Sequence, residues 1–232
     1  MVAVGLGATA LIALGTTMGA TPVKAQDKNV TIGIELPLTG ADADSATRIK
    51  NGAVMAIDDV NAKGGAGGYH LNVTVLDSGT STAGQYDPAQ AATNYKKFIA
   101  DSLVLAAVGP VMSGEGKAIS PILSEADMAT ITPSSTNPDI TDPKFAGQYK
   151  PNGKAIYFRT VTTDAYQGPN MANYMRDTLK VKSVYILDDS GAYGVGMSNA
   201  FEGAADLLLA RGSGGNCSTL RRRAPGPPVL SR

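Results

Sequence analysis

Residues 103–136, LVLAAVGPVMSGEGKAISPILSEADMATITPSST, contain the pattern that decides the fold. The unbroken apolar run over 103–108 predicts a strand buried on both faces, as in a parallel sheet. The run stops at Gly109-Pro110, and the residues over 114–126 predict a helix with a kink at Pro121. A second short strand is predicted over 128–131. This strand–helix–strand order with short connections is typical of a parallel sheet flanked by helices.

The same alternation extends to both sides of this unit. Further strands are predicted over 30–36, 71–76, 155–161 and 183–187, and further helices over 46–63, 87–101, 168–180 and 194–211. Residues 144–154 lack this periodicity and indicate a boundary. We therefore expect a first lobe over 26–144 and a partial second lobe over 145–211. The predicted fold class is α/β with two lobes, of which the second is incomplete because it holds only two strand–helix units.

The two ends of the chain differ from this body. An apolar run over 2–20 followed by Val23-x-Ala25 predicts a secretory signal peptide over 1–25, cleaved after Ala25, and hence a periplasmic location. A transmembrane anchor is the alternative reading of that run. Residues 212–232 show no strand or helix period, so an irregular tail is expected. We interpret this tail either as naturally disordered or, in view of the incomplete second lobe, as the product of a shifted reading frame.

Composition excludes several classes of function. With one His, His70, and one Cys, Cys217, the chain can build neither an internal disulfide nor a zinc site of its own, so no metal or cofactor is expected. Residues 26–211 contain all 20 acidic residues but only 15 of the 20 basic ones, so this part of the chain has a net negative charge. A net negative charge argues against a nucleic-acid partner. Neither a nucleophile–base pair nor a phosphate-binding loop can be assembled, so no catalytic residue is predicted.

Small hydroxyl residues follow two neighbouring predicted strands, namely Ser113 after the first and Ser134, Ser135 and Thr136 after the second. Ligands of open parallel sheets bind beyond the carboxyl ends of the strands. Hydroxyls and the free N–H groups of a helix N-terminus suit a carboxylate. Each residue taken singly is explained as a helix cap or turn former. Together, on neighbouring strands, they favour a binding site for a small acid.

Seven segments within residues 28–211 occur in the order and at the spacing of one known family. They are IGIELPLTG (32–40), GAVMAIDDVNAKGG (52–65), DPAQA (87–91), SSTNP (134–138), FRT (158–160), QGP (167–169) and DDSGAYG (188–194). In these segments the chain resembles the periplasmic substrate-binding proteins of branched-chain amino acid (Leu/Ile/Val) ABC transporters, which are type I binding proteins. The many family members with a disulfide in the first lobe differ from this chain, whose first lobe contains no Cys.

The resemblance implies two lobes that close on a small amino acid or a related carboxylate or amide. It implies delivery of that ligand to the membrane permease of an ABC importer by a monomeric protein, without catalysis. In the family, the segments matching Ser113 and Ser134–Thr136 hold the ligand's carboxylate and amino groups. The tyrosine matching Tyr193 contacts the ligand from the second lobe. The identity of the ligand stays open.

Three other interpretations of the chain are compatible with these observations. The same fold serves as the ligand-binding domain of sensory receptors. An α/β enzyme is a further class, against which the missing base and phosphate loop count. Family chains are considerably longer, so the chain is also interpreted as a truncated or frameshifted fragment that cannot close on ligand.

Overall fold

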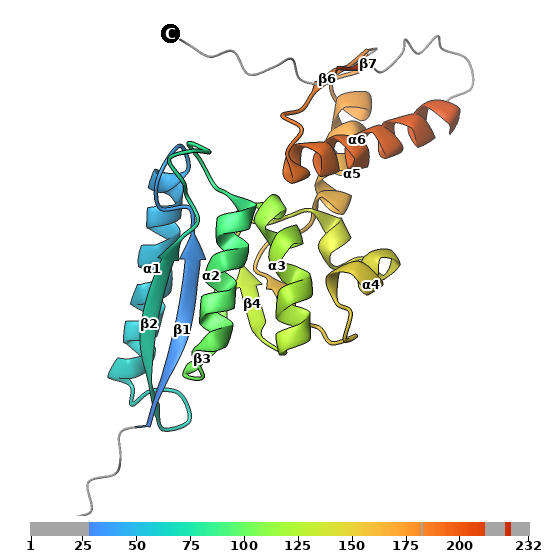
Figure 1. The fold of residues 1–232 in the computed structure, drawn as a ribbon. Helices are drawn as coiled ribbons and strands as arrows, with labels where there is room; N and C mark the ends of the chain where they lie inside the picture. The colour runs from blue at the N-terminus through green and yellow to red at the C-terminus, as the bar shows by residue number, and fades with distance from the viewer. Residues whose placement is uncertain (1–27, 182, 212–220, 224–232) are drawn as a thin grey trace, which may run out of the picture.

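The computed structural model describes residues 28–181, 183–211 and 221–223 (Figure 1). The predicted signal peptide over 1–25 lies outside these residues, as does most of the predicted tail. Three residues of that tail differ from expectation, because Arg221–Arg223 form a strand, β7, which pairs in parallel with β6 (Tyr185–Leu187). A backbone ladder on a neighbouring strand requires no side-chain period, so periodicity could not predict it.

A five-stranded parallel sheet forms the larger part of the molecule, which confirms the predicted fold class. Its strands stand in the order β2-β1-β3-β4-β5. Their bounds are β1 Lys28–Leu36, β2 Tyr69–Asp77, β3 Val104–Val108, β4 Ala129–Thr132 and β5 Tyr157–Arg159. Since β1 pairs with β2 on one side and β3 on the other, chain order reverses there, and this is where open α/β sheets bind ligands.

Helices cover both faces of this sheet (Figure 1). The helix α1 (Ala43–Ala62) packs Ala46 against a small core with Ile34, Leu36 and Val111. The helices α2 (Pro88–Ala100) and α3 (Ser113–Ala126) pack on a second, larger core. Its buried side chains include Tyr95, Phe98, Ile119, Leu123 and Tyr157. These two cores fix the positions of the loops that follow β1, β3 and β4.

The sequence predicted that the first lobe ends at residue 144, but the segment that follows, between β4 and β5, continues the first sheet. It contains two 3-10 turns, η1 (Pro138–Ile140) and η2 (Pro143–Phe145), and the short helix α4 (Ala146–Tyr149). The segment buries Ile140, Tyr149 and Ile156. It leads into β5, which pairs with β4 and so belongs to the first sheet, not to the second lobe. Its polar, aperiodic sequence resembled a linker because only a few scattered side chains reach the core.

The second group of elements begins after β5. It comprises α5 (Asp164–Asp177), β6 and α6 (Ala192–Arg211), with α5 packed against α6 (Figure 1). The helices approach closely at Gly168, where a Cβ would lie 2.7 Å from the backbone of Ala200. Within the described ranges, no helix is long and apolar enough to span a membrane.

Candidate functional site

The loops that follow β3 and β4 meet at the carboxyl edge of the sheet. Ser113 is buried at the start of α3, and its hydroxyl oxygen accepts a hydrogen bond from the backbone N–H of Asn137 at 3.2 Å. The hydroxyl hydrogen of Ser113 stays available for another acceptor. The structure thus brings Ser113 and the 134–137 segment together, as the strand-end argument requires.

Thr132, which the sequence analysis did not single out, shapes the turn that follows β4. Its hydroxyl donates to the carbonyl oxygen of Pro110 at 2.5 Å. The same oxygen accepts from the backbone N–H groups of Ser134 at 3.2 Å and Ser135 at 2.9 Å. One buried side chain therefore ties the Ser134–Ser135 turn to the neighbouring β3 loop.

The three hydroxyl residues of this turn differ in their surroundings. Ser134 is exposed, whereas the hydroxyl oxygens of Ser135 and Thr136 are buried and have no hydrogen-bond partner in good geometry. The Ser135 hydroxyl lies near the Tyr157 hydroxyl, and the Thr136 hydroxyl lies near the Asp164 carboxylate, so both retain capacity for a further hydrogen bond. The pattern is consistent with a polar ligand at Ser135 and Thr136.

A buried carboxylate adjoins these hydroxyls. The backbone N–H of Asp164, the first residue of α5, donates to the carbonyl oxygen of Thr136 at 3.1 Å. Neither carboxylate oxygen of Asp164 has a hydrogen-bond partner in good geometry. Burial raises the pKa of Asp164, while the Thr136 hydroxyl and the Arg159 guanidinium lower it in part. Sequence analysis missed Asp164, although an acidic residue in the first turn of a helix was a signal.

Arg159 holds the backbone of the same segment. Its guanidinium donates to the carbonyl oxygens of Ser135 at 2.8 Å and Asn137 at 2.7 Å, and to the hydroxyl of Thr141 at 2.7 Å. These charge-assisted bonds fix the turn, so the hydroxyls of Ser135 and Thr136 are held in place without side-chain bonds of their own.

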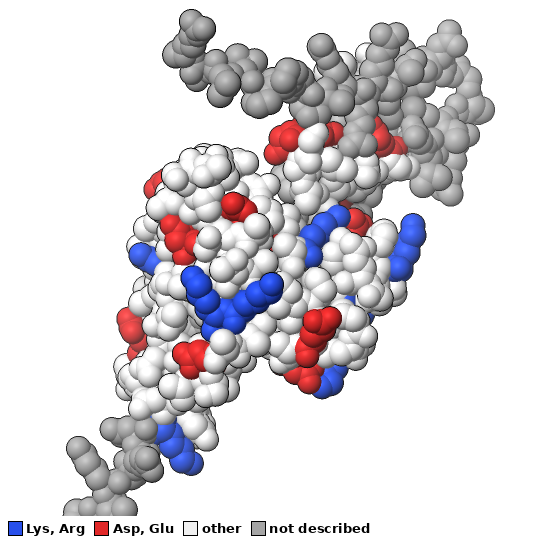
Figure 2. Space-filling view, viewed as in Figure 1, with Lys and Arg blue, Asp and Glu red and all other residues white. Residues whose placement is uncertain are grey.

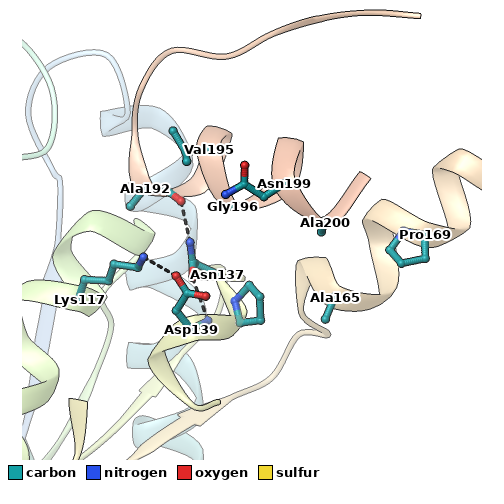
Figure 3. Close-up of a pocket in the computed structure, with 11 residues that line it drawn as sticks. Lys117, Asn137, Asp139, Ala165, Pro169, Ala192, Val195, Gly196, Asn199 and Ala200 are labelled. Atoms are coloured by element: carbon teal, nitrogen blue, oxygen red, sulfur yellow. Dashed lines mark hydrogen bonds and ion pairs between the residues drawn. The ribbon is translucent and has the colours of Figure 1, made fainter. Parts of the chain in front are cut away.

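A cavity of about 340 Å³ lies between the first sheet's loops and the second group of elements (Figure 3). The side-chain amide of Asn137 crosses this boundary and donates to the carbonyl oxygen of Ala192 at 2.7 Å. Lys117 and Asp139 form an ion pair of 2.7 Å on its wall. The opposite wall comes from α5 and α6, through Ala165, Pro169, Val195, Gly196, Asn199 and Ala200.

Tyr193 lies in the first turn of α6 and is 46% exposed. It follows Ala192, which the Asn137 amide contacts, but it is not among the residues that line this cavity. The structure therefore places Tyr193 next to the boundary between the two groups of elements.

The face of the molecule drawn in Figure 2 has no dominant charge. Figure 2 shows basic and acidic side chains interspersed over the drawn face. Among the residues that the structure describes, no three or more His, Cys, Asp or Glu side chains gather in an arrangement that could hold a metal ion.

Comparison with known proteins places this architecture in a family. A family model described as periplasmic binding protein matches residues 29–208. The chain belongs to the periplasmic binding protein family. This confirms the resemblance that the seven sequence segments indicated.

Two named relatives show which members of the family the chain resembles. The Leu/Ile/Val-binding protein BraC3 of Rhizobium johnstonii is 34% identical over 174 residues, which cover 75% of this chain and 43% of the relative. The Leu/Ile/Val-binding protein homolog 3 of Brucella melitensis is 32% identical, covering 83% of this chain and 48% of the relative. This binding protein thus spans about half the length of the curated relatives it matches.

Solved structures of binding proteins resemble this chain as well. The leucine binding protein LivK of Thermotoga maritima superposes with a TM-score of 0.67 at 27% identity, covering 84% of this chain and 48% of that one. The substrate binding protein LivJ of Streptococcus pneumoniae, solved with isoleucine, gives a TM-score of 0.63 at 28% identity, covering 76% of this chain and 47% of that one. These relatives are described as binding proteins.

Proposed function

We propose that this chain captures a small amino acid of the branched-chain class as the solute-binding component of an ABC importer, outside the cytoplasm. The observation that carries the proposal is the group of buried polar side chains at the carboxyl edge of the sheet that make no hydrogen bond in good geometry. The hydroxyls of Ser135 and Thr136 and the carboxylate of Asp164 provide donors and an acceptor in one place. An amino acid supplies both matching groups, a carboxylate and an ammonium.

The roles follow from charge. The ligand's carboxylate takes hydrogen bonds from the hydroxyls of Ser113 and Thr136, with Ser134 and Ser135 supplying the adjoining turn, and the N-terminus of α3 adds favourable electrostatics. The ligand's ammonium group pairs with Asp164, because an ion pair there compensates the cost of a buried carboxylate. Tyr193 contributes from α6 when the two groups of elements close on the ligand.

The remaining parts of the proposal come from the relatives. Their names include Leu/Ile/Val-binding proteins and ABC transporter substrate-binding proteins. We extend this to a monomeric protein that is exported by a signal peptide over residues 1–25, cleaved after Ala25, and that docks on a membrane permease. The proposal assigns ligand capture without catalysis.

Isothermal titration with leucine, isoleucine and valine tests the proposal, with isocaproate, which lacks the amine, and isoamylamine, which lacks the carboxylate, as matched ligands. We expect binding of at least one amino acid and much weaker binding of both analogues. Thr136→Val and Asp164→Asn each lower affinity about tenfold or more, since one buried polar contact contributes about 1–3 kcal/mol. Thr93→Val, on the exposed side of α2, leaves affinity unchanged. Failure of the 232-residue chain to bind any of the three amino acids contradicts the proposal for this chain.

A further inference from the structure

A buried carboxyl group lies in the first sheet, next to the side chains of Ser78 and Asn94. Glu35, the penultimate residue of β1, is 0% exposed, and neither of its side-chain oxygens has a hydrogen-bond partner in good geometry. Its backbone is equally enclosed, because a Cβ on Gly109 would lie 2.1 Å from the carbonyl oxygen of Glu35. An ionised carboxylate in such a position loses its hydration with only partial compensation.

A second buried acid, Glu115, has the opposite arrangement. One of its carboxylate oxygens accepts from the hydroxyl of Ser78 at 2.5 Å, and the other accepts from the backbone N–H of Met112 at 3.0 Å. Two donated bonds favour the ionised form, so Glu115 is the member of the pair that loses its proton first as the pH rises. Its bond to Met112 closes the turn that presents Ser113.

Ser78 lies between the two acids and is itself fixed. Its backbone N–H donates to the carbonyl oxygen of Leu36 at 3.0 Å, and its carbonyl oxygen accepts from Asp87 at 2.9 Å. The single hydroxyl hydrogen of Ser78 is used toward Glu115. The Ser78 hydroxyl therefore has no hydrogen left to donate to Glu35 and can only accept a hydrogen bond from it. Glu35 can donate such a bond only when its carboxyl group is protonated.

The negative charges around Glu35 also favour its protonated form. The charges of Asp77 on β2 and Glu115 on α3 act on Glu35, and the charge of Asp42 ahead of α1 acts on Glu115. The charge of Glu35 in turn acts on Tyr95 on α2. Tyr86 and Tyr157 lie near enough to Glu115 to feel its charge. Burial raises the pKa of Glu35 well above its usual range, and the Glu115 charge raises it further, while Ser78 and Asn94 lower it in part. None of the groups that act most on either acid is a lysine or arginine.

We propose that Glu35 keeps its proton in the folded lobe and donates a hydrogen bond to the hydroxyl oxygen of Ser78, so that a chain of hydrogen bonds linking Glu35, Ser78, Glu115 and Met112 positions the Ser113 turn. Glu35 is in this view a positioning residue, since it acts through two others and touches no ligand. The inference does not depend on which ligand binds, or on whether this chain closes around one.

Infrared spectroscopy in D2O reads the proton directly. At about pH 8 we expect the carbonyl stretch of a protonated carboxyl group in the wild-type protein and its loss in Glu35→Gln. Glu35→Gln keeps a neutral donor, so its melting temperature at about pH 8 is expected to equal or exceed that of the wild type. Absence of the band from the wild-type spectrum overturns the proposal even if the variant does not fold.

Amide hydrogen exchange tests the link to the binding turn. Ser78→Ala removes the hydroxyl that connects the two acids, and we expect exchange at Met112 and Ser113 to accelerate about tenfold or more. Ser120→Ala is the matched control, because Ser120 is also buried in this lobe but donates only to the carbonyl oxygen of Gly116. Equal acceleration at these two amides in both variants contradicts the positioning role.

Discussion

Gly116 occupies a crowded position of α3. A Cβ there would lie 2.5 Å from the hydroxyl of Tyr157, 2.8 Å from a methyl carbon of Ile140 and 3.0 Å from the hydroxyl of Ser135. All three neighbours are buried, so none can move away freely. The absence of a side chain at residue 116 is what allows the helix, β5 and the candidate binding turn to meet.

Gly116→Ala is therefore expected to destabilise the protein by about 1–3 kcal/mol, because it overpacks this junction. Gly52→Ala is the control. Gly52 also lies inside a helix, but a Cβ there meets nothing within 4 Å, so alanine should stabilise by roughly 0.5–1 kcal/mol. Urea denaturation measures both. Stabilisation by Gly116→Ala would show that the three neighbouring side chains can move away from an added methyl group.

At the scale of single residues, the sequence allowed part of the candidate site to be predicted. Ser113 and the 134–136 segment could be placed at one edge because strand ends are visible in the pattern. Thr132, Arg159 and Asp164 could not, because their roles depend on contacts with residues 20 or more positions away or on burial created by α5. The predicted contact of Tyr193 with a ligand stays a prediction.

The helix α2 shows how one capping residue defines an element. The side chain of Asp87 accepts hydrogen bonds from the backbone N–H groups of Ala89 at 2.8 Å and Gln90 at 3.3 Å, and Pro88 follows it at the first helical position. This arrangement confirms the helix start that the sequence predicted. The cap also lies beside Ser78, which places it close to the buried acid pair.

We expect Asp87→Ala to lower the free energy of unfolding by about 1 kcal/mol, since two N–H groups lose their acceptor. Asp59→Ala, on the exposed side of α1, should change it by less than about 0.5 kcal/mol. Denaturant titrations monitored by circular dichroism compare the two variants. Equal effects from both would argue against a capping role.

At the scale of elements, prediction succeeded where periodicity is strong and failed where contacts are sparse. The five strands of the first sheet and the helices between them follow from apolar runs and helical spacing. The position of β5 in the first sheet could not be predicted, because the 138–156 segment before it has no strand or helix period that would link it to the core. The start of α5 was set four residues late, since Gly168-Pro169 resembles a helix start, whereas Thr163-Asp164 begins the helix.

Stability of the whole molecule should depend on pH through its buried acids. Burial raises the pKa of Glu115 from 4.5 to about 7, and it raises that of Glu35 as well. Between the two values for Glu115 the folded state binds more protons than the unfolded state, so stability is fully present below about pH 4.5 and falls as the pH rises towards 7. The loss is up to roughly 3 kcal/mol.

Thermal melts at several pH values between about 5 and 8 measure this effect. The wild-type melting temperature should fall across that range, and Glu115→Gln should reduce the fall because the titrating group is gone. A wild-type melting temperature that rises steadily with pH would have the wrong sign and would exclude this account.

The two groups of elements are connected through Asn137, whose side chain makes one bond across the boundary to Ala192 and one to the backbone of Asp139. Asn137→Ala should destabilise the protein by about 1–3 kcal/mol and raise the rate of limited proteolysis between β5 and α5. Asn152→Ala is the control, because the side chain of Asn152 bonds to Ser124, Asp127 and Lys154, all of which precede β5. Unchanged proteolysis of Asn137→Ala would show that the boundary is held by other contacts.

The strand order β2-β1-β3-β4-β5 has a consequence for biosynthesis. Every strand of this sheet comes from one continuous stretch, and after β3 each new strand joins the free edge left by the one before it. A nascent chain therefore has all of its hydrogen-bonding neighbours for the first sheet once β5 has left the ribosome. Since domains tend to fold as units in the order of their synthesis, this lobe can reach its native core while α5 and α6 are still being made.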